Sequence, residues 1–287
     1  MALWQTNHVA ALLGVAHDGL VVDALVVSTV GDRRLDLPIA SIGGKGVFAK
    51  EVQAAVLDGR ADVAVHSGKD LPSTTPAGLV VAAVLARQDP RDALVGCRLA
   101  DLAQGATVGT GSPRRRLQLR ALRPDLRFVD VRGNVGTRLA KLDDGVAAAL
   151  VLAVSGLTRL GLADRISEIL EPSTMLPQVA QGTLAVECRE ADSATRALLA
   201  ALEDAESRRR FDAERAFLET LGGDCDLPAG AYATLAHGTG IVRLDALIGA
   251  GDAIETVTVE GSNPVAVGRE AAEVLLTRVG ERPVAAP

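Results

Sequence analysis

The sequence predicts an α/β protein built around a parallel sheet, with a smaller α+β unit at the C-terminal end. Between residues 107 and 161 the order strand, small-residue turn, helix occurs three times, and such repetition is typical of parallel strands joined by right-handed crossovers. After residue 230 the pattern changes to three short apolar runs followed by one helical segment, which indicates α+β structure. The chain of 287 residues is long enough for two or three domains.

The first part of the chain is expected to alternate helices and strands. It opens on a helix, because apolar residues recur there at near-helical spacing with no strand before them. Val-rich and Ala-rich runs then indicate strands. The expected elements are, in order, the opening helix, a strand over 20–30, a Gly-Gly-Lys-Gly turn at 43–46, a helix over 47–57, and strands over 62–65 and 79–85.

A second series follows the polar break at 88–92, which is a candidate crossing between domains. Each of its three strands leads through a turn of small or polar residues into a helix. The expected pairs are strand 107–108 with the helix carrying Arg114, Arg115, Arg116 and Arg120, strand 126–131 with helix 135–142, and strand 148–153 with the short helix ending at 159–161.

The last part begins with a loosened, Pro-containing pattern from residue 171. A strand is expected over 184–188, followed by a long charged helix over 193–221 for which Asp204 marks the place of a break. The tail is expected to hold strands over 232–235, 241–248 and 255–259 and a closing helix over 263–279.

Composition excludes several classes of protein. The net charge of −6 gives no general attraction to polyanions, and aromatic residues, at 2%, are too few for base stacking. Three widely spaced cysteines with no C-x-x-C pair suggest neither a disulfide framework nor a zinc site. No secretory leader and no apolar run of about 18 residues is seen. We therefore expect a soluble cytoplasmic protein that binds neither nucleic acid nor membranes.

Asp70 is the strongest candidate for a catalytic group. The run 62–65 is a predicted strand, and Ser67, Gly68 and Pro72 are residues that end strands. Asp70 would then lie just past the carboxyl end of a strand, where open α/β sheets bind ligands. With Lys69 beside it, its carboxylate can stay ionised and face a cation on a substrate. The alternative is an Asp that caps the next element.

The arginines at the helix starts indicate an anion site. Ser112 and Pro113 suit the first positions of a helix, so three arginines fall in its first turn, where positive charge opposes the helix dipole. A bound anion would reverse that cost. Basic residues recur at 132–138 and at Arg159, which suits a ligand with several carboxylates or phosphates. The alternative is a set of solvated surface arginines.

Cys225 lies in a loop rich in Gly and Pro that would present its side chain. The flanking Asp224 and Asp226 should raise the pKa of its thiol, so by itself the context favours an inert loop cysteine. Cys188 is expected in the core, and His66 is expected to serve in hydrogen bonding or packing.

Five motifs together carry a family resemblance. They are Gly43-Gly44-Lys45-Gly46-Val47-Phe48, His66-Ser67-Gly68-Lys69-Asp70-Leu71-Pro72, Asp89-Pro90-Arg91-Asp92, Arg132-Gly133-Asn134-Val135-Gly136-Thr137-Arg138-Leu139 and Gly223-Asp224-Cys225. With them the chain resembles the hydroxymethylbilane synthase family, also called porphobilinogen deaminase. The resemblance runs from residue 1 to about residue 232 with few gaps and continues weakly to the end.

The resemblance implies a transferase that joins four porphobilinogen molecules head to tail onto a dipyrromethane cofactor, releasing ammonia and finally hydroxymethylbilane. Cys225 would hold the cofactor through a thioether, and Asp70 would stabilise pyrrole cations and move protons. Further cofactor contacts are implied for Lys69, Asp32, Ser112, Arg114, Arg115 and Arg132. Contacts to substrate carboxylates are implied for Lys45, Arg138 and Arg159. The family also implies a monomer.

The implied fold is two periplasmic-binding-protein-like α/β domains plus a small C-terminal α+β domain bearing the cysteine. We expect the first domain over 1–87 and 183–203, the second over 88–182, and the third over 204–287. The family begins with a β-strand and an Arg-x-Ser turn, and this chain starts at the helix that follows them, so that strand is expected to be missing. Ser41 stands where many members have Lys, and Asp224 where Gly is usual. The alternatives are a non-catalytic, two-lobed polycarboxylate-binding protein and an inactive truncated homologue.

Overall fold

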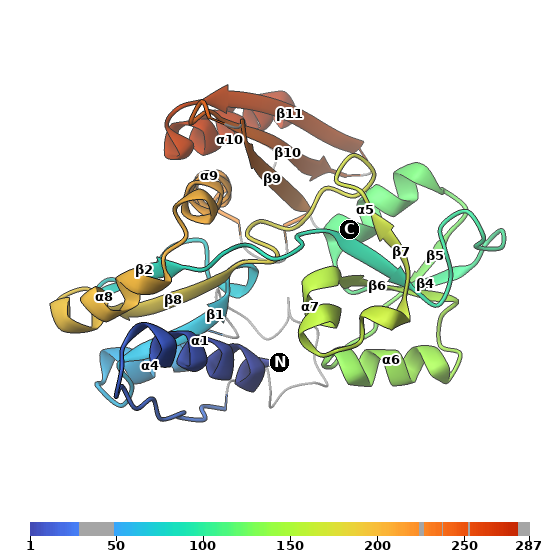
Figure 1. Cartoon of the computed structure of the whole chain (residues 1–287). Helices are drawn as coiled ribbons and strands as arrows, with labels where there is room; N and C mark the ends of the chain where they lie inside the picture. Colours follow the sequence, from blue (N-terminus) through green and yellow to red (C-terminus); the bar gives the residue numbers. More distant parts are fainter. Residues whose placement is uncertain (29–48, 224–226, 237, 252, 281–287) are drawn as a thin grey trace.

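The computed structural model describes residues 1–28, 49–223, 227–236, 238–251 and 253–280. In these residues the strands form three sheets, with the orders β1-β8-β2, β5-β4-β6-β3-β7 and β11-β10-β9. Figure 1 shows the first two sheets with their helices as two lobes side by side, and the third sheet above them. This arrangement confirms the α/β class with a smaller C-terminal α+β unit.

The first lobe is built on a sheet in which β8 lies between β1 and β2 and runs antiparallel to both. Strands β1 and β2 are therefore parallel to each other. Helix α1 packs Val9 and Leu13 into the same core as Val186 and Leu199. The elements of this lobe are α1 (Ala2–Ala16), α4 (Lys50–Leu57), β1 (Val63–Ser67), the short 3-10 helix η1 (Gly68–Asp70), β2 (Leu79–Val84), β8 (Leu184–Arg189), α8 (Ser193–Leu199) and η3 (Ala200–Leu202).

The strand expected over 20–30 is wrong for its described part, because residues 20–28 contain no strand. The side chains of Val21 and Val26 are 80% and 77% exposed. A Val-rich run becomes a strand only where another strand offers its backbone for pairing, and within the described residues β1 pairs with β8 alone.

The second lobe contains the parallel units predicted from the sequence. Strand β4 pairs in parallel with β5 and β6, whereas β3 joins this sheet antiparallel to both β6 and β7. The expectation of a parallel sheet is therefore correct for three strands, and it missed β3 and β7. The elements are β3 (Asp92–Val95), β4 (Thr107–Gly109), α5 (Pro113–Leu122), β5 (Arg127–Val129), α6 (Val135–Asp143), β6 (Ala149–Ala153), α7 (Val154–Arg159), η2 (Ala163–Arg165) and β7 (Ile166–Leu170).

Two chain segments cross between the lobes. Residues 85–91 leave β2 and enter β3, and residues 171–183 return from β7 to β8. The segments are hydrogen-bonded to each other, since the Gln88 N–H donates to the Gly182 carbonyl over 3.1 Å. This pair of crossings is the only backbone connection between the two lobes within the described residues.

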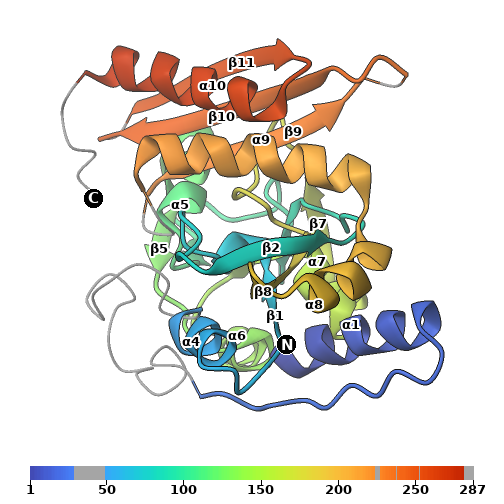
Figure 2. The same ribbon diagram turned by 90° about the vertical axis from the view of Figure 1, so that its left-hand side faces the viewer.

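The C-terminal unit is an antiparallel sheet covered by two helices. Figure 2 shows α9 between this sheet and the first lobe, with α10 alongside the sheet. The break expected near Asp204 is confirmed, because the Asp204 side chain accepts the Ser207 N–H and begins α9. Helices α9 and α10 meet closely at Gly268, where a Cβ would lie 2.1 Å from the Ala213 carbonyl. The elements are α9 (Ala205–Leu221), β9 (Ala229–Leu235), β10 (Val242–Ala250), β11 (Ala253–Gly261) and α10 (Pro264–Val279).

Within the part of the chain that the structure describes, no helix is both long and apolar enough to cross a bilayer.

Candidate functional site

Asp70 occupies the predicted position just past the end of β1, as the last residue of η1. The turn that places it is tight, because a Cβ on Gly68 would lie 2.9 Å from the Ala180 side chain. The Asp70 side chain keeps part of its surface exposed. No hydrogen bond reaches its carboxylate from any described residue. As far as the described residues show, Asp70 therefore offers unfilled acceptor oxygens at the edge of the first lobe.

Four basic groups surround Asp70 and come from both lobes. Burial raises the pKa of the Asp70 carboxyl above its ordinary value, and four nearby side chains oppose that rise. They are Lys69, His66, Arg138 and Arg159. A carboxylate without hydrogen bonds in a basic pocket can hold a negative charge or take up a proton with little reorganisation.

Lys69 lies beside Asp70 and points toward the crossing segment. Its Nζ donates to the side-chain oxygen of Gln181 over 3.2 Å. Burial lowers the pKa of Lys69 to about 8, and Asp70 and Asp92 act against this effect. Lys69 is therefore a cation whose charge changes in the neutral to weakly alkaline range.

Arg114 and Arg115 converge on one buried carboxylate, Asp92 at the start of β3. Arg114 Nη2 donates to Asp92 Oδ2 over 2.8 Å and Arg115 Nη2 to Asp92 Oδ1 over 2.7 Å. Gln181 Nε2 donates to the same Oδ1 over 2.8 Å. Burial alone would raise the pKa of Asp92, but the two guanidinium charges and these hydrogen bonds hold it well below its usual range.

Carboxylates of the protein offset part of the positive charge at the start of α5. Asp92 is shared by Arg114 and Arg115, and the third arginine of the first turn, Arg116, pairs with Asp130, so two negative charges face three positive ones. The anion site at the start of α5 therefore stays a prediction. Ser112 occupies the N-cap position as predicted, but its side chain makes no capping hydrogen bond.

Arg138 and Arg159 face Asp70 from the second lobe. Burial lowers the pKa of each to about 10, and Asp70 counteracts this effect in both. Arg138 Nε donates to the Gly133 carbonyl over 2.8 Å. Arg159 donates from Nε to Gln88 and from Nη2 to the Gly182 carbonyl, and its guanidinium lies 5.7 Å from the ring centre of Trp4 in α1. Arg132 lies near Arg138 and is half-buried.

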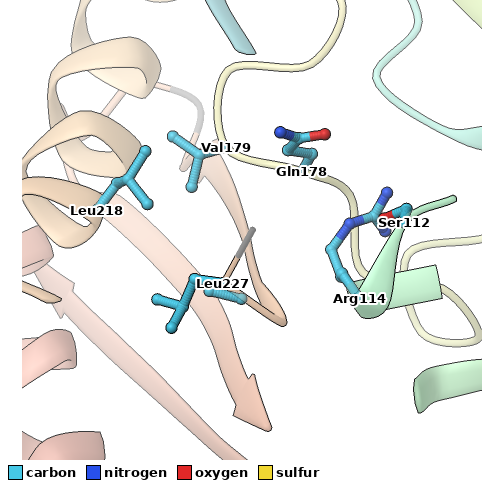
Figure 3. A pocket seen from close by; sticks show the side chains of 7 residues that line it. Ser112, Arg114, Gln178, Val179, Leu218 and Leu227 are labelled. Atoms are coloured by element: carbon cyan, nitrogen blue, oxygen red, sulfur yellow. The ribbon is translucent and has the colours of Figure 1, made fainter. Parts of the chain in front are cut away.

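A small pocket lies where α5, the crossing segment and the C-terminal unit meet. Figure 3 shows its polar wall, formed by Ser112, Arg114 and Gln178, opposite Val179, Leu218 and Leu227. The Nε atoms of Arg114 and of its neighbour Arg115 are buried and have no hydrogen-bond partner within the part of the chain that the structure describes. The pocket therefore joins an apolar wall to buried basic side chains.

Three of the predicted site residues, Asp32, Lys45 and Cys225, lie outside the described residues. Of the loop around Cys225, Gly223 and Leu227 are described, and Leu227 lines the pocket of Figure 3. The structure places six of the predicted site residues close enough for their charges to affect one another's pKa, namely Lys69, Asp70, Arg114, Arg115, Arg138 and Arg159.

His66 and Cys188 are both buried, which agrees with the predicted packing role of His66 and the predicted core position of Cys188. His66 Nε2 lies 2.9 Å from Glu187 Oε2, without hydrogen-bond alignment, and Gln53 Nε2 donates to the same carboxylate. Cys188 is fully buried.

Two residues of the cluster, Asp92 and Gln181, were not predicted from the sequence. Asp92 had a visible signal, because it directly precedes the apolar run Ala93-Leu94-Val95, and a carboxylate at the head of a buried strand needs a basic partner. Gln181 had none, because its role depends on three contacts that are distant in sequence.

Comparison with protein-family models matches most of the chain. Residues 1–197 match a model described as porphobilinogen deaminase, dipyromethane cofactor binding domain. Residues 209–277 match a model described as porphobilinogen deaminase, C-terminal domain.

Comparison with solved structures finds more distant similarity. A VFT2 domain of the Bordetella pertussis protein BvgS is 18% identical, with 74% of this chain and 82% of that chain covered and a TM-score of 0.42. A TRAP periplasmic solute binding protein from Ralstonia eutropha, solved with bound (S)-2-hydroxy-2-methyl-3-oxobutanoate, is 15% identical, with 75% and 76% covered and a TM-score of 0.42.

Proposed function

The chain belongs to the porphobilinogen deaminase family, and from that premise we propose that Asp70 is the catalytic group of its active site. The protein is a transferase of tetrapyrrole biosynthesis that polymerises porphobilinogen onto a dipyrromethane cofactor. The observation that carries our assignment is the Asp70 carboxylate, which accepts no hydrogen bond from the described residues and lies among basic groups of both lobes.

The described residues fit a cofactor that carries carboxylates. Arg114 lines the pocket together with Leu227, and the buried Nε atoms of Arg114 and Arg115 have no partner among the described residues. Guanidinium groups are the preferred partners of carboxylates, so these two arginines, with Ser112, Lys69 and Arg132, would hold the cofactor. When bound through Cys225, the cofactor supplies the pyrrole onto which substrate is joined.

Asp70 acts on the substrate cation. Loss of ammonia breaks the aminomethyl carbon–nitrogen bond of porphobilinogen and leaves positive charge on the pyrrole ring. The free oxygens of Asp70 accept the ring N–H and stabilise that charge. Because burial raises the pKa of its carboxyl, Asp70 also serves as acceptor for the proton released when the new carbon–carbon bond forms.

Arg138 and Arg159 would bind the acidic side chains of the substrate. Both lie close enough to Asp70 for their charges to affect its pKa, so a ring held against Asp70 would place its carboxylates within their reach. Arg159 has already committed two nitrogens to the crossing segments. We therefore assign the larger share of substrate binding to Arg138. Lys45 and Asp32 keep the contacts that the family resemblance implies for them.

The proposal extends to the setting of the enzyme. We propose that it works as a monomer in the cytoplasm, with porphobilinogen as its substrate and with neither nucleic acid nor a membrane as partner. Sedimentation of the purified protein at several concentrations tests the first point. A concentration-dependent rise in mass would contradict a monomer.

Intact mass spectrometry and turnover test the function directly. The purified protein is expected to exceed its sequence mass by two linked pyrrole units and to consume porphobilinogen. Cys225→Ser should abolish the extra mass, whereas Cys97→Ser, a matched control outside the site, should retain it. A protein without the extra mass that still binds polycarboxylates would support the non-catalytic alternative.

A further inference from the structure

Gln181 connects the two lobes at the centre of the site. It lies on the second crossing segment and is completely buried. Its Oε1 accepts Lys69 Nζ from the first lobe over 3.2 Å. Its Nε2 donates over 2.8 Å to the Pro90 carbonyl on the first crossing segment and over 2.8 Å to Asp92 Oδ1 in the second lobe.

The orientation of the Gln181 amide is fixed by what surrounds it. Its two N–H groups face two acceptors, a carbonyl and a carboxylate, and its oxygen faces an ammonium. A flipped amide would set oxygen against oxygen and N–H against N–H. Glutamate would place a second carboxylate against Asp92, and leucine or methionine would leave Asp92 with one donor fewer. Only an amide of this length satisfies both lobes.

The backbone on either side holds Gln181 in place. Ala180 has a φ of 58°, which is uncommon for a residue with a side chain, and its N–H donates to the buried Glu214. Gly182 has a φ of 87°, and a Cβ there would lie 2.4 Å from the Gln88 carbonyl. The two neighbours therefore set the Gln181 side chain in a single direction between the crossing segments.

We propose that Gln181 is a positioning residue that ties the Lys69 ammonium to the Asp92–Arg114–Arg115 cluster of the opposite lobe. Lys69 adjoins Asp70 in sequence, and both belong to the active site proposed above. Through Gln181, Lys69 of the first lobe is held at a fixed position relative to Arg114 and Arg115 of the second lobe. The inference rests on the proposed function for its meaning, but the contact it describes is measurable without turnover.

Charged groups of three elements face Lys69. They are Asp70 in η1, Asp92 in β3 and Arg114 and Arg115 in α5. The Gln181 oxygen stabilises the charged form of Lys69, because an ammonium donates a stronger hydrogen bond to a carbonyl than the neutral amine does. Removal of that oxygen lowers the pKa of Lys69 further, and replacement by a carboxylate raises it.

Competitive labelling with trace acetic anhydride across a pH series, read by mass spectrometry, measures the ionisation of Lys69 in the cofactor-loaded protein. The midpoint of the unaltered chain, measured in the same loaded state, is the reference for every variant. Gln181→Met, which is nearly isosteric, should move it down by about one unit, the effect of one hydrogen bond to a charged group. Gln181→Glu should move it up.

Gln178→Leu is the matched control. Gln178 lies on the same segment and donates to the Lys69 backbone carbonyl over 3.4 Å, not to the ammonium, so the labelling midpoint of Lys69 should not change. Lys69→Met tests the contact from the other side and should shift the Gln181 side-chain amide resonances. An unchanged midpoint in either folded Gln181 variant would overturn the proposal, as would unmoved Gln181 resonances.

Activity separates this proposal from the function itself. If the unaltered protein consumes no porphobilinogen, the proposed function fails, while the labelling still reports on the contact. If Gln181→Met lowers kcat but leaves the Lys69 midpoint in place, Gln181 has only a structural role and the inference is wrong.

Discussion

Asp70 and Asp92 are two carboxylates in the same basic cluster with opposite environments. Asp92 is completely buried and accepts three side-chain hydrogen bonds, from Arg114, Arg115 and Gln181. Asp70 is partly exposed and accepts none within the described residues. The pKa of Asp92 lies below its ordinary value and that of Asp70 lies above. The charges of Arg114 and Arg115, together with hydrogen bonds, outweigh burial at Asp92, whereas burial outweighs the surrounding charges at Asp70.

This difference in hydrogen bonding shows which of the two carboxylates is available to a substrate. The carboxylate of Asp92 accepts hydrogen bonds from three side chains of the protein, and its charge holds the start of β3 against α5. It therefore has no acceptor position left for a ligand. Asp70 has basic groups nearby but unfilled acceptor positions, so a substrate N–H can complete its environment. Each prediction below tests this contrast between a structural carboxylate and a catalytic one.

Asp70→Asn should produce the largest loss of activity. The amide keeps the shape of the side chain but lacks the charge that faces the substrate cation and cannot accept the released proton. We expect kcat to fall by about 10²- to 10⁴-fold, with the dipyrromethane mass retained. Steady-state consumption of porphobilinogen and intact mass check this expectation.

Asp62→Asn is the control for that loss. Asp62 directly precedes β1, at the opposite end of the same strand, and pairs with Arg189 on the surface. Its substitution should leave kcat unchanged. If Asp70→Asn turned over at a near-normal rate, the contrast drawn between the two carboxylates would have no catalytic meaning.

Asp92→Asn should produce the largest loss of stability. It would leave the buried guanidinium groups of Arg114 and Arg115 without their counter-charge, and breaking a buried ion pair costs about 3–5 kcal/mol. Urea unfolding should show a lower midpoint with an unchanged slope. Asp130→Asn removes the exposed partner of Arg116 on the same helix, and should cost only about 0–1 kcal/mol. Equal losses in the two variants would contradict the structural role of Asp92.

The contrast could be predicted from the sequence only in part. The position of Asp70 followed from local signals, because Ser67, Gly68 and Pro72 end the strand that precedes it. The basic turns followed from the repeated strand and helix pattern. The elements β4, α5, α6, β6, β8 and α9 were predicted for the same reason, since their apolar spacing is local.

What could not be predicted depends on contacts between distant segments. Asp92 and Arg114 are 22 positions apart in the sequence, and no local signal indicates that their side chains pair, so the sequence predicts the arginines as anion ligands and not as partners of a carboxylate of the protein. Strand β3 was missed because only four residues form it, and it follows a polar segment typical of a loop. Residues 20–28 carry a strand-like composition, yet pairing decides whether a strand forms.

Arg138→Gln should have a smaller, kinetic effect. Arg138 faces the unfilled Asp70 side of the cluster, and its loss should remove one charge-assisted hydrogen bond to a substrate carboxylate. Such a bond contributes about 1.5–3 kcal/mol, so kcat/KM should fall by about tenfold or more. Arg115→Gln should in addition lower the unfolding midpoint, because Arg115 donates to the buried Asp92. If Arg138→Gln changed only stability, the assignment of Arg138 to substrate binding would be wrong.

The smallest expected effect is a change in the free energy of unfolding at neutral pH. Its sign should differ between the Asp70 and the Asp92 variant. Burial raises the pKa of Asp70 in the folded protein, so its ionised form costs folding free energy. That cost is absent below the ordinary value of 3.8, grows as the pH rises toward the raised folded value, and is constant above it. Asp70→Asn should therefore be slightly more stable than the unaltered chain at neutral pH.

For Asp92 the sign is reversed, because its depressed pKa gives a stabilisation that is complete above 3.8 and lost as the pH falls below it. Urea unfolding of both variants at matched cofactor content, between about pH 5 and about pH 8, measures both signs. A loss of stability in Asp70→Asn would mean that Asp70 is satisfied within the folded protein, which would remove the reason for assigning it the catalytic role.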